Sequence, residues 1–164
     1  MSHRQPCTSS SVLGKKPQGR GPQDTIIKPI GKSKFDADFM LHLAEVVEWA
    51  YSPKTYIDKA YDALHRHSVY GDMPHTRKRR CVQLSYANSM HVDIVPYLRL
   101  EDGREVIVNR DANVWEGTNP AGFTAWMQKK DSIVNGNLRK VFRLLSRACL
   151  AGVCLFQPPR RMVW

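Results

Sequence analysis

Two acidic motifs set in strand-like apolar runs constrain the fold of this 164-residue chain more than any other feature. In Phe35–Phe39 (FDADF) the aspartates alternate with apolar residues, so a β-strand would point Asp36 and Asp38 to one face. In the second run, Asp93 stands inside the apolar segment 92–96 (VDIVP), where a carboxylate is costly without a partner. The pattern predicts neighbouring strands of one sheet that carry three carboxylates.

Three carboxylates on neighbouring strands repel one another unless a cation lies between them. Mg²⁺ takes oxygen ligands from one or two carboxylates and completes its shell with water and substrate phosphate. Asp36, Asp38 and Asp93 are therefore candidate ligands of a two-metal site for phosphoryl or nucleotidyl transfer. The alternative is that Asp36 and Asp38 lie on a solvated strand face and Asp93 on a sheet edge. The residues alone leave both interpretations open.

The size, charge and cysteine content of the chain narrow the class of protein. A length of 164 residues suits one domain with a real core. The 25 Lys and Arg residues outnumber the 15 Asp and Glu residues, which favours polyanionic partners such as nucleic acid, nucleoside triphosphates or anionic lipid. The four cysteines lack metal-ligand spacing, and neither a signal peptide nor a bilayer-length apolar run is evident. These features predict a soluble cytoplasmic protein without membrane contact.

The pattern of apolar residues predicts an α+β fold with a mixed, largely antiparallel sheet and flanking helices. Residues 1–24 lack any period and are expected to form a flexible tail, and 71–80 a basic loop. After Ser52-Pro53 an apolar stripe at helical spacing predicts a helix that packs on the sheet. The remaining expected elements are strands at 25–30, 35–43, 81–86, 91–98 and 105–109, and helices at 119–130 and from 137.

Four segments together resemble a known family. They are TIIKPI (25–30), FDADFM (35–40), RCVQLSYANSMHVDIVP (80–96) and WEGTNP (115–120). In order and context they are similar to bacterial nucleotidyltransferases, and more narrowly to the cyclic-oligonucleotide synthases related to oligoadenylate synthase and cyclic GMP–AMP synthase. The resemblance extends over roughly residues 18–147.

The resemblance implies a polymerase-beta-type nucleotidyltransferase fold and a reaction on nucleoside triphosphates. Asp36 and Asp38 would hold two Mg²⁺ (or Mn²⁺) ions and the triphosphate. Asp93 would bind the catalytic metal and help to activate the attacking ribose hydroxyl. The product would be a cyclic oligonucleotide that activates a separate effector protein in anti-phage defence. Contact with nucleic acid is compatible with this function but not required by it.

The resemblance also implies a triphosphate-binding loop. Family members carry a Gly–Ser pair six residues ahead of a threonine that is here Thr25. Gly19 and Arg20 occupy the register of that pair, so Gly19, Arg20 and Thr25 are the candidate substrate-binding residues. Arg20 replaces the serine, and Pro22 removes an N–H donor from the loop.

The resemblance stops near residue 147, where family members continue into a helical second domain. The expected organisation is therefore a tail (1–24), a catalytic domain (25–147) and an atypical C-terminal tail (148–164), with the second helical domain missing. We expect a truncated member of the family with little activity of its own. Two alternatives stay open: a non-catalytic nucleotide- or nucleic-acid-binding module, and a transferase that adds a nucleotide to a drug, a tRNA or a protein.

Overall fold

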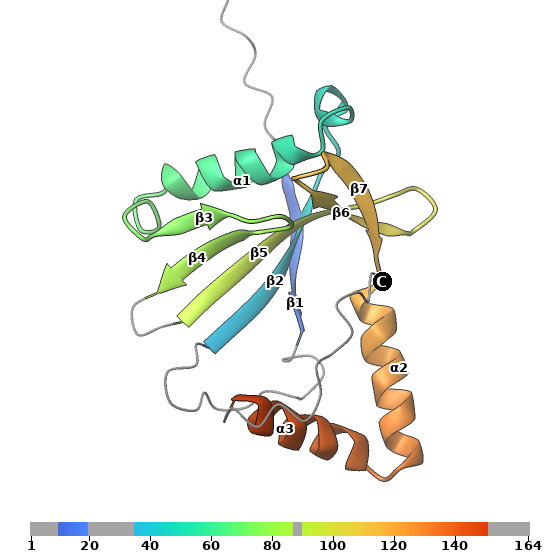
Figure 1. Ribbon diagram of the computed structural model, residues 1–164. Coiled ribbons are helices and arrows are strands. Elements are labelled where there is room, and N and C mark those ends of the chain that lie inside the picture. The colour runs from blue at the N-terminus through green and yellow to red at the C-terminus, as the bar shows by residue number, and fades with distance from the viewer. Residues whose placement is uncertain (1–9, 20–34, 87–89, 151–164) are drawn as a thin grey trace, which may run out of the picture.

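The computed structural model describes residues 10–19, 35–86 and 90–150. The strand predicted at 25–30 lies outside these residues. The described elements, labelled in Figure 1, are β1 (Val12–Gln18), β2 (Phe35–Leu43), the short 3-10 helix η1 (Val47–Trp49), α1 (Lys54–His65), β3 (His75–Arg77), β4 (Val82–Tyr86), β5 (Met90–Arg99), β6 (Glu105–Asn109), β7 (Val114–Thr118), α2 (Pro120–Ile133) and α3 (Asn137–Leu150).

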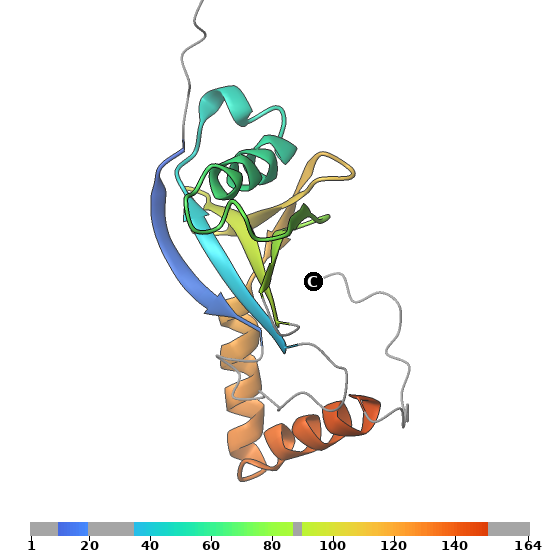
Figure 2. The ribbon, with the colours of Figure 1, turned by 90° about the vertical axis from the view of Figure 1, so that its left-hand side faces the viewer.

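The seven strands belong to one sheet. Strands β1, β2, β5, β4 and β3 lie side by side in that order, and β6 pairs with both β5 and β7. The pair β2–β5 is parallel, and the other described pairs are antiparallel. Figures 1 and 2 show α1 lying across the sheet, with α2 and α3 towards its opposite end. The predicted α+β fold with a mixed, mostly antiparallel sheet is confirmed.

The hydrophobic core lies between α1 and one face of the sheet. Tyr56 and Ile57 of α1 are at most 1% exposed and pack with Val82 of β4 and Leu98 of β5. The Tyr56 hydroxyl also accepts a hydrogen bond from the Val46 amide at 2.8 Å, so its buried polar atom has a partner. The apolar stripe predicted for this helix is therefore confirmed as core.

The first strand differs from the sequence-based expectation. Val12–Gln18 was expected within a flexible tail, but it forms the antiparallel edge strand β1 against β2. Its side chains are exposed or half-buried, so the sequence lacks the alternation of apolar and polar residues that would predict a strand here. Main-chain pairing with β2 and an ion pair between Lys16 and Glu105 of β6 (Nζ–Oε1 2.7 Å) hold it instead.

Glu105 has a second cationic partner, Arg99, at 3.1 Å. Burial by itself would raise the pKa of Glu105, but the hydrogen bonds from Lys16 and Arg99 outweigh burial and hold the pKa below its ordinary value. The Glu105 carboxylate therefore stays charged at neutral pH and ties the edge strand β1 to β6 across the sheet.

Two further strands lie where none was expected. β3 (His75–Arg77) falls within the predicted basic loop 71–80, and β7 (Val114–Thr118) precedes α2. Arg77 of β3 forms an ion pair with Asp58 of α1 (2.9 Å) and lies over the ring of Tyr61. Arg77 of the basic segment 71–80 thus attaches β3 to α1. The number of charges in the segment does not predict this contact.

The two C-terminal helices begin as the sequence predicts. The Asn119 side chain accepts a hydrogen bond from the Gly122 amide at 2.8 Å, so Asn119 caps α2. Asp131, which is 1% exposed, accepts a hydrogen bond from the Arg139 amide and pairs with its guanidinium, joining α2 to α3. Helix α3 continues to Leu150 and so crosses the expected boundary at 147. In the described part of the chain, no helix is long and apolar enough to cross a membrane.

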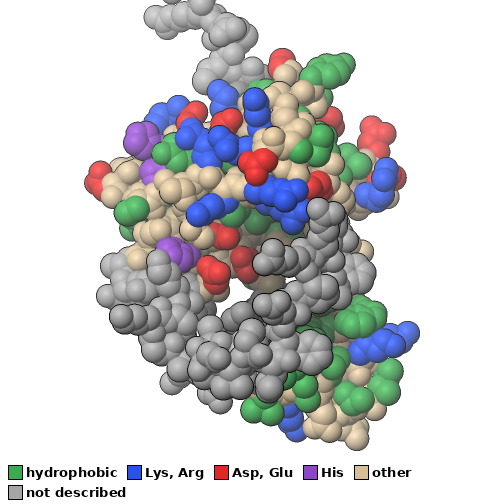
Figure 3. Space-filling model, in the orientation of Figure 1, with side chains coloured by type: hydrophobic (Ala, Val, Ile, Leu, Met, Phe, Trp, Pro, Cys, Tyr) green, Lys and Arg blue, Asp and Glu red, His purple; other side chains and the backbone are tan. Residues whose placement is uncertain are grey.

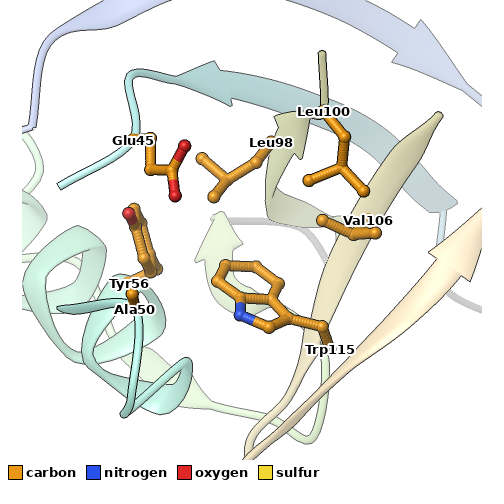
Figure 4. A pocket seen from close by; sticks show the side chains of 7 residues that line it. All are labelled: Glu45, Ala50, Tyr56, Leu98, Leu100, Val106 and Trp115. Carbon is orange, nitrogen blue, oxygen red and sulfur yellow. The ribbon is translucent and has the colours of Figure 1, made fainter. Parts of the chain in front are cut away.

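A small cavity of about 130 Å³ lies at the edge of the core (Figure 4). It is lined by Glu45, Ala50, Tyr56, Leu98, Leu100, Val106 and Trp115. Since Leu98 and Tyr56 belong to the core, the cavity lies on the face of the sheet that α1 covers. Asp38 and Asp93 alternate with the core residues of their strands and so lie on the other face, away from this cavity.

Candidate active site

Asp38 and Asp93 are direct neighbours on the parallel strands β2 and β5. Their Cα atoms are register partners, and adjacent strands lie about 4.8 Å apart. Leu43 on β2 and Leu98 on β5 belong to the core, and side chains alternate along a strand. Both aspartates therefore point away from this core, to the face of the sheet opposite α1. In Figure 3 a few acidic side chains lie close together near the middle of the visible face.

Asp36 lies on the same face, two residues before Asp38, and its register partner on β5 is His91. Its side chain is exposed, whereas Asp38 and Asp93 are half-buried. Among the described residues, no three His, Cys, Asp or Glu side chains converge closely enough to hold one ion. The site thus consists of an adjacent pair, Asp38 and Asp93, with Asp36 further towards solvent.

The backbone of β1 ends against the acidic pair. Gly19 follows β1 with φ +73°, and a Cβ atom at this position would lie 2.5 Å from Oδ2 of Asp38. Only a residue without a side chain permits so close an approach at that φ. Gly19, which was predicted to bind substrate, therefore lies against Asp38. Arg20 and Thr25, predicted with it, lie outside the described residues.

The donor atoms around this pair suit a hard divalent cation. Two carboxylates are as many as Mg²⁺ commonly takes from protein, the remaining ligands being water and phosphate. Gln18, the register partner of Asp38 on β1, adds a buried Oε1 atom with no hydrogen-bond partner among the described residues. A buried acceptor without a donor calls for a ligand or water beside it. The residues present therefore fit the metal.

Two residues that contact Asp93 were not predicted from the sequence. They are Gln83 of β4 and Cys81, which directly precedes that strand. Nε2 of Gln83 donates a hydrogen bond to Oδ1 of Asp93 at 2.9 Å, and the Cys81 thiol also interacts with this carboxylate. The alternation of residues 81–86 was visible in the sequence. Its polar side could be assigned to the site only once the β4–β5 register was known.

The contact between Gly19 and Asp38 can be tested with two matched glycines. Gly19 and Gly103 both have positive φ, but nothing lies within 4 Å of a Cβ built at Gly103. We expect Gly19→Ala and Gly103→Ala each to lose about 1–2 kcal/mol of unfolding free energy in urea, because alanine disfavours that φ. Only Gly19→Ala should also abolish the rise in melting temperature caused by Mg²⁺ plus a nucleoside triphosphate. Equal responses of both variants to the ligands would show that Gly19 does not shape the site.

The arrangement of strands and helices is that of a nucleotidyltransferase fold. The model of the Second Messenger Oligonucleotide or Dinucleotide Synthetase domain matches residues 3–131, which is most of the chain. The protein therefore belongs to this family. The match begins before residue 25 and includes β1.

Individual relatives support this assignment. A c-di-GMP synthase of Roseivirga ehrenbergii is 30% identical over 113 residues, covering 67% of this chain and 30% of the relative. Apo DncV of Vibrio cholerae matches with a TM-score of 0.68 at 19% identity, over 89% of this chain and 42% of DncV. The CD-NTase CdnG of Bradyrhizobium diazoefficiens, solved with GTP, matches with a TM-score of 0.57 at 24% identity, over 70% and 32%. The structures show a shared fold, and the chain spans less than half of each protein.

Proposed function

We propose that the chain carries the catalytic face of a Mg²⁺-dependent nucleotidyltransferase that joins nucleoside triphosphates into a cyclic oligonucleotide. The observation that carries this proposal is the pairing of Asp38 with Asp93 on parallel strands of a chain from this family. It is supported by the structures of two relatives, CdnG and DncV, that hold GTP.

The three acids share the work in this proposal. Asp36, Asp38 and Asp93 would hold the cations, and Asp93 would also orient the attacking ribose hydroxyl. Bound Mg²⁺ or Mn²⁺ would neutralise charge on the α-phosphoryl group and on the pyrophosphate leaving group. Gly19 lets the backbone that follows β1 approach Asp38 closely. Positioning and electrostatic stabilisation then supply most of the rate.

The product would act as a second messenger on a separate effector protein in anti-phage defence, in the cytoplasm. The family description supports the messenger role. Cys81, a buried free thiol, fits a reducing compartment. A competing function is nucleotide binding without turnover. It is favoured by Arg20, which stands in place of the expected serine, and by Pro22, which lacks an N–H donor for phosphate. Product analysis distinguishes a cyclic oligonucleotide from a nucleotide added to a drug, a tRNA or a protein.

Direct binding of a non-hydrolysable nucleoside triphosphate tests the proposal. Equilibrium dialysis with a labelled analogue should show binding in Mg²⁺ that is lost with a chelator and lost in Asp38→Asn/Asp93→Asn. The control is Asp102→Asn, which removes a carboxylate from the exposed turn between β5 and β6 and should leave binding unchanged. Binding that is indifferent to the metal and to the two acids contradicts the proposal.

A further inference from the structure

Four strands bring one row of polar side chains into register. Gln18 of β1 is the partner of Asp38 on β2, Asp38 is the partner of Asp93 on β5, and Asp93 is the partner of Gln83 on β4. Partners in a sheet point to the same face, so the acidic pair is flanked on both sides by an amide. The proposed function uses the two acids. It leaves open what holds their carboxylates in one orientation.

Gln83 makes a directed contact with Asp93. Its Nε2 atom donates to Oδ1 at 2.9 Å, within the range of a good hydrogen bond. A carboxylate offers about four acceptor positions, so one donor leaves the greater part of the group available to a cation. The bond restrains rotation of the Asp93 side chain. Without it, repulsion between the two carboxylates would turn Asp93 away from Asp38.

Cys81 provides a second donor. It lies two residues before Gln83 and so on the same face, it is 7% exposed, and its thiol donates a hydrogen bond to Asp93. A thiol can donate a weak hydrogen bond.

We propose that Gln83 and Cys81 are positioning residues that together fix the Asp93 carboxylate for metal binding. The inference rests on the proposed function, because it concerns the same metal. Neither residue needs to touch substrate; both act through Asp93. Partners of this kind, which hydrogen-bond a metal-binding carboxylate, are typically worth 10–100-fold in metal affinity or activity.

Mn²⁺ binding by the full chain tests this without requiring turnover. Free Mn²⁺ is measured by electron paramagnetic resonance in the presence of a non-hydrolysable nucleoside triphosphate. We expect Gln83→Met, which keeps the shape but removes the donor, and Cys81→Ala each to weaken Mn²⁺ affinity about 10–100-fold. Cys81→Ser, which retains a donor, should stay closer to the unaltered chain. The control is Thr76→Val, at the exposed partner of Gln83 on β3.

Thermal melting without metal shows whether each variant is folded. If Gln83→Met is not folded, the comparison of Cys81→Ala with Cys81→Ser tests the inference instead. A purely structural role for Cys81 predicts that serine, a buried hydroxyl, is no better than alanine, and that result overturns the inference. Unweakened affinity in Gln83→Met and Cys81→Ala, with Asp93→Asn still losing Mn²⁺, overturns the inference alone. Absence of triphosphate-dependent Mn²⁺ binding in the unaltered chain overturns the proposed function, and the inference with it.

Discussion

Addition of Mg²⁺ and a nucleoside triphosphate is expected to raise the melting temperature of this chain by about 5–10 °C. Ligands at about 100 times their dissociation constant stabilise a folded protein by about 2.7 kcal/mol, and each kcal/mol is worth about 2–4 °C at this size. The stabilisation should be this large because the cation also removes the repulsion between the adjacent Asp38 and Asp93 carboxylates.

The double variant Asp36→Asn/Asp38→Asn should lose this ligand-induced rise in melting temperature. Without metal it should melt at or above the temperature of the unaltered chain, because two of three like charges on one sheet face are gone. With Mg²⁺ and triphosphate it should show no further rise. Asp102→Asn, in an exposed turn, serves as the control and should keep the full ligand-induced shift. An equal shift in the double variant would count against a metal at these acids.

The second large effect concerns turnover. Incubated with mixed nucleoside triphosphates and Mg²⁺, the 164-residue chain should form little or no product. Arg20 replaces the short hydroxyl expected beside the triphosphate, and Pro22 lacks an N–H donor.

Restoring Gly–Ser at 19–20 by Arg20→Ser should recover synthesis, measured by mass spectrometry of the products. Asp93→Asn in that restored protein should lower the rate again by on the order of 10²–10³ or more, the usual cost of losing one strong transition-state contact. Robust synthesis by the unaltered chain would show that the expected loop chemistry is dispensable. Synthesis that survives Asp93→Asn would remove Asp93 from the site.

The sequence predicts those elements whose burial follows a period. β2, β5, β6 and α1 were all recognisable because apolar residues such as Ile57, Leu98 and Val108 recur at strand or helix spacing. β1, β3 and β7 were not expected, because their side chains are mostly exposed or half-buried and they are held by main-chain pairing and ion pairs. Such contacts depend on distant residues, as in Lys16 with Glu105, and leave no local pattern.

The same distinction holds for the candidate site. Alternation along each strand predicts that Asp36 and Asp38 share a face, and the structure agrees. Which residue of β5 faces Asp38 depends on the register of two segments far apart in the chain, and periodicity carries no information about it. Gln83 and Cys81 were missed for this reason, since their role depends on a second register, between β4 and β5.

The parallel pairing of β2 with β5 has a consequence for the order of folding. The chain between these strands contains α1, β3 and β4, so the pair can form only after a long loop closes, whereas the antiparallel neighbours β4–β5 and β6–β7 connect through short segments. Hairpins and the α1 core should therefore assemble first, and the two carboxylates should meet late, against a framework already able to hold them together. A partly folded chain would then have no place for a divalent cation, and the ability to bind one would report completion of the fold.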